Sequence, residues 1–211
     1  MNQILLTNLK NHVKKYKNIK KLKILLFVSL ALMLTSFLFY AYNYVKTIKD
    51  ANLSTALLNS FNIERLYSKQ KNSYTSITLN NNGDFFVIGS IEIPSIQINY
   101  PILSHTNDEL LKIAPCRFYG PSPNKEGNLC IAAHNYDDNR FFGNLNKLNI
   151  GDKINIYDSS NSLISYYIYD KFETKDSDTS CTLQNTNGTK EITLVTCNNL
   201  NGNRLIVKAR E

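Results

Sequence analysis

Hydrophobic and polar positions divide the chain into three stretches. Residues 24–44 form an unbroken apolar stretch without a charged residue. Residues 45–84 are polar, and their second half is crowded with Asn, Ser and Thr. Beyond Asp84, short apolar runs are separated by Gly, Pro, Asn and Asp, and most of them alternate with polar positions, as half-buried strands do. The pattern therefore predicts one membrane-length helix, a connecting segment and a domain that is mostly β.

Seven or eight short strands are predicted in residues 85–211. The runs that carry this prediction are Ile91/Ile93, Ile96/Ile98/Tyr100, Leu129 to Ala133, Ile154/Ile156, Ser165 to Tyr169, Ile192/Leu194 and Leu205/Val207/Ala209. Strands of this number and length favour a closed, mostly antiparallel barrel. Helical turns are predicted at residues 107–113 and 140–148, the second because its apolar residues recur at i, i+4 and i+7.

Residues 24–45 are predicted to anchor the protein in a membrane, because about 20 apolar residues suffice to span a bilayer as a helix. Residues 1–23 contain seven lysines and no acid, so the positive-inside rule places this tail in the cytoplasm and the β domain outside the cell. A cleaved signal peptide is the alternative. It is disfavoured because the apolar stretch exceeds a usual signal core and no Ala-x-Ala site follows.

The net charge of +7 does not indicate a nucleic-acid partner. The chain has 24 basic and 17 acidic residues, and seven of the basic ones lie in residues 1–23, which leaves 17 of each sign in the remainder. A nucleic-acid-binding domain would carry its excess of positive charge on the folded part. We therefore expect no nucleic acid among the partners.

The connecting segment, residues 46–84, is predicted to be a stalk with a short helix. Leu57, Leu58, Phe61 and Leu66 recur at near-helical spacing. Such a helix would either lead from the membrane to the β domain or lie on the surface of that domain.

Cys197 is the candidate reactive residue among the four cysteines. The four show neither paired spacing nor a Cys-x-x-Cys metal signature, so one functional thiol is the simplest interpretation. Residues 191–197 and 204–209 read as two strands flanking a six-residue turn-forming loop. In such a hairpin, Cys197 and Arg204 nearly face each other. A cation there favours the thiolate and can stabilise an oxyanion on a substrate.

A proton-transferring residue has to come from the three histidines. His12 lies in the predicted cytoplasmic tail, and His105 is interpreted as a surface turn residue. His134 ends the apolar run that starts at Leu129, and a strand end can hold a polar side chain rigidly at a rim. We therefore predict that His134 is the partner of Cys197.

These residues carry a resemblance to the sortase family. Thr193-Leu-Val-Thr-Cys197, the downstream Arg204, and His134 within Gly127-Asn-Leu-Cys-Ile-Ala-Ala-His-Asn135 resemble the sortase signature. The resemblance covers about residues 85–211. It implies an eight-stranded sortase-like β-barrel with short helices, which would follow the N-terminal transmembrane helix. It also implies a Cys-His-Arg site that cuts a sorting signal, commonly Leu-Pro-x-Thr-Gly, between Thr and Gly through a thioacyl enzyme.

Carried over to this chain, the resemblance gives each residue a role. Cys197 attacks the carbonyl, His134 protonates the leaving amine and later deprotonates the incoming one, and Arg204 binds substrate and oxyanion. Thr196 and Asn198, which flank the cysteine, are further predicted substrate contacts. The expected partners are secreted proteins with a C-terminal sorting signal and an amine acceptor of the cell wall, either a precursor or peptidoglycan.

No cofactor or metal is expected. The one candidate for calcium is the acidic turn Asp137-Asp138-Asn139, and a short acidic turn is far more often only a turn.

The subclass stays open at this level. The chain has no Asp-Pro and no Trp, which disfavours the lidded, pilin-polymerising class C. The short segment between Phe172 and Ile192 leaves little room for the helical insertion of class B, although the helix before the barrel and His134-Asn135 resemble that class. An open-cleft enzyme of class A or D is preferred. The alternatives are a membrane-anchored cysteine protease, with water as acceptor, and a non-catalytic β-barrel binding module.

Overall fold

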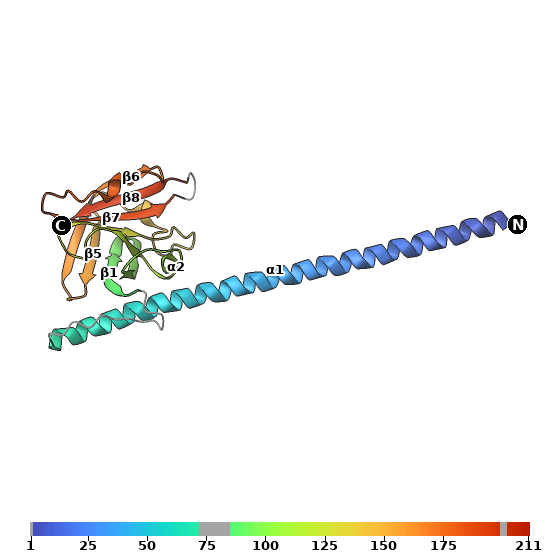
Figure 1. The fold of residues 1–211 in the computed structure, drawn as a ribbon, viewed down its shortest axis with the longest axis horizontal. Helices are drawn as coiled ribbons and strands as arrows, with labels where there is room; N and C mark the ends of the chain where they lie inside the picture. Colours follow the sequence, from blue (N-terminus) through green and yellow to red (C-terminus); the bar gives the residue numbers. More distant parts are fainter. Residues whose placement is uncertain (1, 72–84, 199–201) are drawn as a thin grey trace. The chain divides into compact units, whose positions relative to one another are not determined.

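The computed structural model describes residues 2–71, 85–198 and 202–211 (Figure 1). Two compact units are present, Met1–Lys49 and Asp50–Glu211. Helix α1 (Asn2–Lys71) contributes to both units. The predicted stalk residues 72–84 lie outside the described residues.

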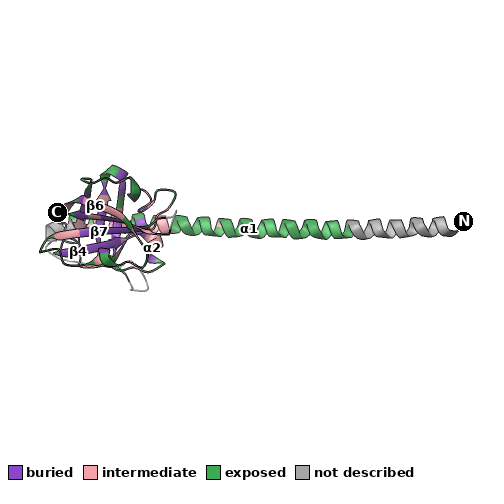
Figure 2. Ribbon diagram, turned by 90° about the horizontal axis from the view of Figure 1, so that it is seen from above, coloured by how far each residue is buried: buried purple, intermediate pink, exposed green. Residues whose placement is uncertain are grey.

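The first unit consists of α1 alone. Within residues 20–64 of this helix, one window of 18 residues has a mean hydropathy of 2.3, and none of it is buried. Residues 20–40 are all exposed, and Figure 2 shows the exposed part of the helix in green. A helix that is apolar on all faces and has no protein partner fits a membrane anchor.

Besides the end of α1, the described part of the second unit contains eight strands and four short helical segments. The strands are β1 (Val87–Ile93), β2 (Ile98–Leu103), β3 (Cys116–Tyr119), β4 (Gly127–Ala132), β5 (Lys153–Asp158), β6 (Leu163–Thr174), β7 (Lys190–Cys197) and β8 (Arg204–Arg210). The helical segments are α2 (Leu110–Ile113) and the 3-10 turns η1 (Pro94–Ile96), η2 (Leu145–Lys147) and η3 (Ser180–Thr182).

The strands close into a barrel in the order β1-β2-β3-β4-β7-β8-β6-β5. The β2–β3 and β4–β7 pairs are parallel, and the other six pairs are antiparallel. The predicted eight-stranded, mostly antiparallel barrel is confirmed. The β2–β3 junction is the weakest in the barrel, because Leu103 and Cys116 are its single register pair. The parallel β4–β7 pair brings the carboxyl ends of two strands to the same end of the barrel.

The interior of the barrel is filled by aliphatic and aromatic side chains. Leu129 and Ile131 of β4 point into this core together with Ile192 and Leu194 of β7. Because successive residues of a strand face opposite sides, the residues between them face outward. On this outer face the loop between β6 and β7, residues 175–189, contributes Cys181 to a second small cluster with residues of β7 and β8.

A further cluster joins the end of α1 to the barrel. Leu57 and Phe61 are buried against Phe85, Val87 and Leu103, and residues of α2 and β3 complete the cluster. Leu66 is exposed. The helical spacing of apolar residues in this segment therefore reflects packing on the β domain as far as Phe61.

Two local features differ from the sequence-based expectation. Strand β3 was not predicted, because its four residues do not alternate and its ladder with β4 is interrupted by a register shift. The predicted helical turn at 140–148 is wrong in its first part. Phe141 has a φ of 51°, and only η2 is helical. Its apolar positions Phe141, Leu145 and Leu148 are nevertheless buried in the barrel core.

Candidate functional site

The register of the β4–β7 strand pair places His134 beside Cys197. In the parallel β4–β7 ladder, Ala132 is paired with Val195, and the N–H of Ala133 donates to the carbonyl oxygen of Val195 at 3.2 Å. Continuing this register by two residues from Ala132 and Val195 places His134 beside Cys197. Cys197 is in turn paired with Arg204 in the antiparallel β7–β8 ladder.

The three side chains share the outer face of the barrel. Val195 and Ile206 belong to the outer cluster with Cys181, whereas Leu194 and Val207 belong to the interior core. Because Cys197 lies two residues from Val195 and Arg204 two residues from Ile206, both face outward. The same alternation along β4 sends His134 outward. The predicted histidine, cysteine and arginine thus come together at the carboxyl ends of β4 and β7.

Burial separates Cys197 from the other cysteines. Cys197 is exposed, whereas Cys116, Cys130 and Cys181 are buried, and all four thiols are free. Burial raises the pKa of the Cys116 and Cys130 thiols to about 12, and it also raises the pKa of Cys181. Since the thiolate is the nucleophile, these three are unsuited to attack a carbonyl at neutral pH.

The backbone around Cys197 is held by side chains from neighbouring segments. The Nδ2 of Asn135 donates to the carbonyl oxygen of Cys197 at 2.8 Å, and the hydroxyl of Thr196 donates to the carbonyl oxygen of Ala133 at 2.8 Å. Beyond the strand, the Nδ2 of Asn198 donates to Oε1 of Glu173 on β6 at 2.6 Å. Thr196 is buried, because its side chain points inward where that of Cys197 points outward.

His134 is held by the loop that follows it. Its carbonyl oxygen accepts a hydrogen bond from the N–H of Phe142 at 3.1 Å, and its ring lies 5.2 Å from that of Tyr136, centroid to centroid. The guanidinium of Arg140 lies over the Tyr136 ring at 4.4 Å. This close packing requires Gly143, because a Cβ there would lie 2.3 Å from the carbonyl oxygen of Tyr136.

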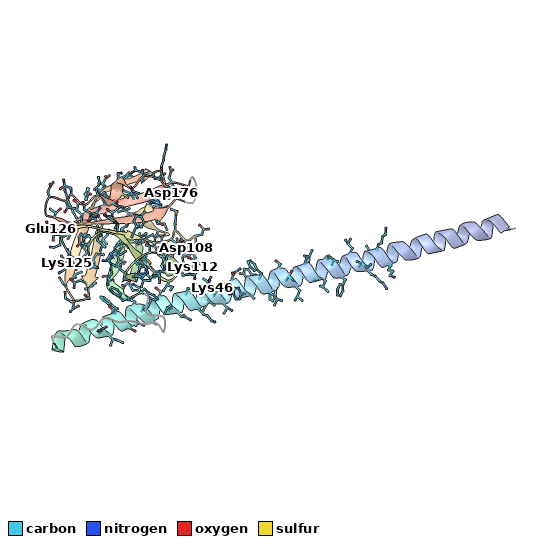
Figure 3. All side chains as sticks on the ribbon, in the orientation of Figure 1. Lys46, Asp108, Lys112, Lys125, Glu126 and Asp176 are labelled. Atoms are coloured by element: carbon cyan, nitrogen blue, oxygen red, sulfur yellow. The ribbon has the colours of Figure 1, made fainter. Side chains whose placement is uncertain are left out.

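The electrostatic surroundings lower the pKa of His134. Partial burial is the main cause, the positive charge of Lys112 adds to it, and Asp108 opposes it. Asp108 and Lys112 lie toward one end of the barrel, and Lys125 and Glu126 lie toward the other (Figure 3). The neutral imidazole is therefore favoured at neutral pH.

Arg204 forms an ion pair on the side of β8 away from Cys197. Its Nη2 lies 2.6 Å from Oδ1 of Asp176, in the loop after β6. Thr174, the last residue of β6, is the register partner of Arg204. In the strand order β4-β7-β8-β6, His134 follows β4, Cys197 ends β7, Arg204 begins β8 and Asp176 follows β6.

The other residues considered from the sequence, as a proton carrier or a metal ligand, lie apart from His134, Cys197 and Arg204. His105 is exposed in a turn, and its Nδ1 lies 3.1 Å from the hydroxyl oxygen of Ser104. Asp138 of the acidic turn pairs with Arg140 at 2.7 Å. Within the described part of the chain, no group of three His, Cys, Asp or Glu side chains is placed to hold a metal ion.

Sequence reasoning missed Asp176 and Tyr136 as neighbours of the site. Both lie in loops, where strand alternation gives no information about direction. Among the residues that support the site, only Asn135 could be suspected from the sequence, because it directly follows His134. Its observed hydrogen bond to Cys197 spans 62 residues of sequence and could not be read from any local pattern.

Comparison with known proteins identifies relatives of the β domain. The family model for the sortase domain matches residues 91–211. The chain is 32% identical over 114 residues to sortase A of Listeria monocytogenes and 30% identical over 118 residues to sortase A of Bacillus anthracis. Each match covers 53% of this chain, and the chain spans about half of each relative, 49% and 52% respectively.

A solved structure shows the same fold over a larger part of the chain. A sortase D5 transpeptidase from Clostridium perfringens superposes with a TM-score of 0.62 at 28% sequence identity. The superposition covers 76% of this chain and 98% of that structure.

Proposed function

The chain belongs to the sortase family, and we propose that it is a membrane-anchored cysteine transpeptidase with Cys197 as nucleophile. The observation that carries this proposal is that three predicted site residues face outward together at the carboxyl ends of β4 and β7. There the exposed thiol stands between the strand end that bears His134 and the strand start that bears Arg204. A nucleophile, a proton carrier and a cation at one rim are the groups that acyl transfer requires.

In the first half of the proposed reaction, the Cys197 thiol gives its proton to the neutral His134, and the resulting thiolate attacks the carbonyl carbon of the substrate threonine. A C–S bond forms, and the negative charge that develops on the carbonyl oxygen is stabilised by the Arg204 guanidinium. The peptide C–N bond then breaks, and the imidazolium of His134 gives its proton to the departing amine. A thioacyl enzyme and a neutral His134 result.

In the second half, an amine resolves the thioacyl enzyme. The nitrogen of the amine attacks the thioester carbon, His134 accepts the proton from that nitrogen, and the C–S bond breaks to release the Cys197 thiolate. A new amide bond has replaced the original peptide bond. The imidazolium then returns its proton to the thiolate, which restores the thiol and the neutral imidazole of the resting site.

The proposed substrates are secreted proteins that carry a C-terminal sorting signal of the Leu-Pro-x-Thr-Gly kind, and the proposed acceptor is an amine of the cell wall. Residues 24–45 would hold the enzyme in the membrane, with residues 1–23 in the cytoplasm and the β domain outside. Support comes from the exposed apolar helix and from the lysines that precede it.

Residues 175–189 support an open cleft of the class A or class D kind. This segment contains only the single turn η3 and no long helix. The Clostridium perfringens structure, described as a sortase D5, agrees with this assignment. In our proposal Asn198 contacts the substrate from the rim. Thr196, the other residue that we predicted to contact the substrate, is buried and would instead position Cys197 through its bond to Ala133.

The test uses the full chain in lipid nanodiscs and quenched fluorescent peptides that contain variants of Leu-Pro-x-Thr-Gly. We expect the wild-type protein to cleave at least one of them between Thr and Gly, and Cys197→Ala to cleave none. Equal behaviour of the two proteins over the whole panel would refute the enzymatic proposal and leave a binding module.

Product analysis separates a transferase from a protease. With an added amine such as triglycine, we expect mass spectrometry to find the threonine carboxyl joined to that amine. If only the free acid appears at every amine concentration, water is the acceptor and the protein is a protease.

A further inference from the structure

The turn after β6 places a carboxylate against the proposed oxyanion-stabilising group. Asp176 lies two residues beyond Thr174, and its Oδ1 is 2.6 Å from Nη2 of Arg204. The Arg204 side chain is 23% exposed and that of Asp176 is 71% exposed. The pair therefore forms at the rim, where a substrate also has access to the guanidinium.

The turn that carries Asp176 is held by hydrogen bonds of its own. Asp178 accepts hydrogen bonds from the hydroxyl of Thr174 at 2.6 Å and from the N–H of Ser180 at 2.8 Å. These bonds lower the pKa of Asp178 to about 2, so they persist at any physiological pH. Cys181 is buried in the outer cluster. The chain is thus fixed to the barrel on both sides of Asp176.

The same end of β6 holds both ends of the loop between β7 and β8. Glu173 accepts a hydrogen bond from Asn198, which follows Cys197, and Asp176 pairs with Arg204, which begins β8. The described ends of this loop carry the nucleophile and the cation. Their side-chain ties to β6 would keep the two residues at a constant separation.

We propose that Asp176 is a positioning residue that holds the Arg204 guanidinium ready for the substrate carbonyl; this inference rests on the proposed function. An arginine side chain has many rotamers, and a site is more effective when these are restricted before the substrate binds. A contact through one oxygen to Nη2 occupies a single edge of the guanidinium fork. The remaining N–H groups stay available to a substrate oxygen.

The kinetic test compares Asp176→Ala, Asp176→Asn and Asp176→Glu in the full chain, with the cleavable peptide found above. We expect Asp176→Ala to lower kcat about three- to tenfold with little change in KM, as for a group that acts on the transition state through an exposed ion pair. Asp176→Glu should restore part of the loss, and Asp176→Asn less. Turnover of Asp176→Ala equal to or faster than wild type would overturn the proposal.

The matched control is Glu211→Ala. Glu211 forms a comparable exposed ion pair with Lys190 at the opposite end of β7, at 2.8 Å. We expect its removal to leave kcat unchanged. An equal loss in both variants would show that Asp176 acts through general stability, and that result also counts against the proposal.

A second measurement does not depend on turnover. The Nε–Hε resonance of Arg204, assigned by its loss in Arg204→Lys, should show an ordered side chain in the wild type and a mobile one in Asp176→Ala. Equal order in both proteins would refute the inference even if no peptide is ever cleaved. A wild type no more active than Cys197→Ala would instead refute the proposed function, so the two failures are distinguishable.

Discussion

The outer face of the β4–β7 strand pair has two stretches that use similar residues in opposite ways. In the covered stretch, Cys130 and Thr193 lie beneath the loop of residues 175–189 and are buried. In the open stretch, four residues further along each strand, His134 is half-buried and Cys197 is exposed. Both stretches belong to the same strands and face the same way.

The difference shows that burial under the loop, more than residue type, determines whether a cysteine here can act as a nucleophile. Burial holds the Cys130 thiol protonated by raising its pKa to about 12, whereas Cys197 has solvent access and an arginine as its register partner. The polar side chains of the covered stretch are bonded to one another: Asn128 accepts from Thr193 and donates to the carbonyl oxygen of Cys181. Those of the open stretch face solvent, where a substrate has access.

The largest effect expected from this comparison separates the two cysteines. Cys197→Ala should lower peptide cleavage by at least about a thousandfold, as removal of a nucleophile does. Cys130→Ala should retain cleavage within a few-fold and lower Tm, because it leaves a small cavity in a packed region. Cleavage rates and thermal unfolding curves of both variants test these two expectations. Loss of cleavage in Cys130→Ala with the fold intact would contradict the assignment.

The next effect concerns the two ends of β8. Arg204→Lys keeps the charge but loses the planar fork, so we expect cleavage to fall by about a hundredfold or more while Tm is retained. The matched control is Arg210→Lys at the other end of the strand, where the guanidinium lies 4.9 Å from the Tyr169 ring centroid. A near-normal rate in Arg204→Lys would remove Arg204 from the site.

The covered stretch should respond in stability. Asn128 is fully buried, and its amide group bonds to Thr193 and to the carbonyl oxygens of Cys181 and Leu183. Asn128→Ala leaves these partners unpaired and should lower the free energy of unfolding by about 2–4 kcal/mol. The neighbouring exposed Asn185→Ala serves as control and should change it little. A chemical denaturation series measures both, and equal stabilities would show that the polar cluster is dispensable.

The smallest effect is a shift in pH dependence in the open stretch. Lys112 lowers the pKa of His134, so Lys112→Gln should raise that pKa, and Asp108→Asn should lower it. The His134 limb of the pH–rate profile should move the same way. Lys125→Gln, at the other end of the barrel, is the control (Figure 3). Identical profiles in all four proteins would mean that these charges do not reach the imidazole.

The lowered pKa of His134 also has a consequence for stability. Folding favours the neutral imidazole, so the contribution of His134 is present above its ordinary pKa of 6.5 and is lost as the pH falls through the lower, folded value. His134→Gln should therefore flatten the decline of Tm in this acidic window. A decline that is unchanged in the variant would assign it to other groups.

Most of the barrel followed from strand alternation, because β1, β5, β7 and β8 each present one apolar side to the core. Strand β3 escaped detection since it is short and its ladder shifts register. Phe141, Leu145 and Leu148 are buried in the core, but their helical spacing arises from a loop with a left-handed residue and not from a helix over 140–148.

The proposed triad could be found from sequence because each member sits where a strand begins or has just ended, next to a recognisable motif. The residues that support it could not be found in that way. Asp176 contacts Arg204 from a loop after β6, and Asn135 bonds to Cys197 from the segment that follows the neighbouring parallel strand β4. Such contacts depend on the three-dimensional path of loops, which no local pattern encodes.

The central claim is that Cys197 forms a covalent thioacyl bond with a cleaved peptide. Intact-protein mass spectrometry of the full chain, quenched in acid shortly after mixing with a cleavable peptide and without amine, measures this directly. We expect a mass increase equal to the acyl fragment, located on Cys197 by digestion and absent in Cys197→Ala. Cleavage of the peptide by the wild type with the acyl fragment on another residue, or with Cys197→Ala acylated equally, would contradict the account.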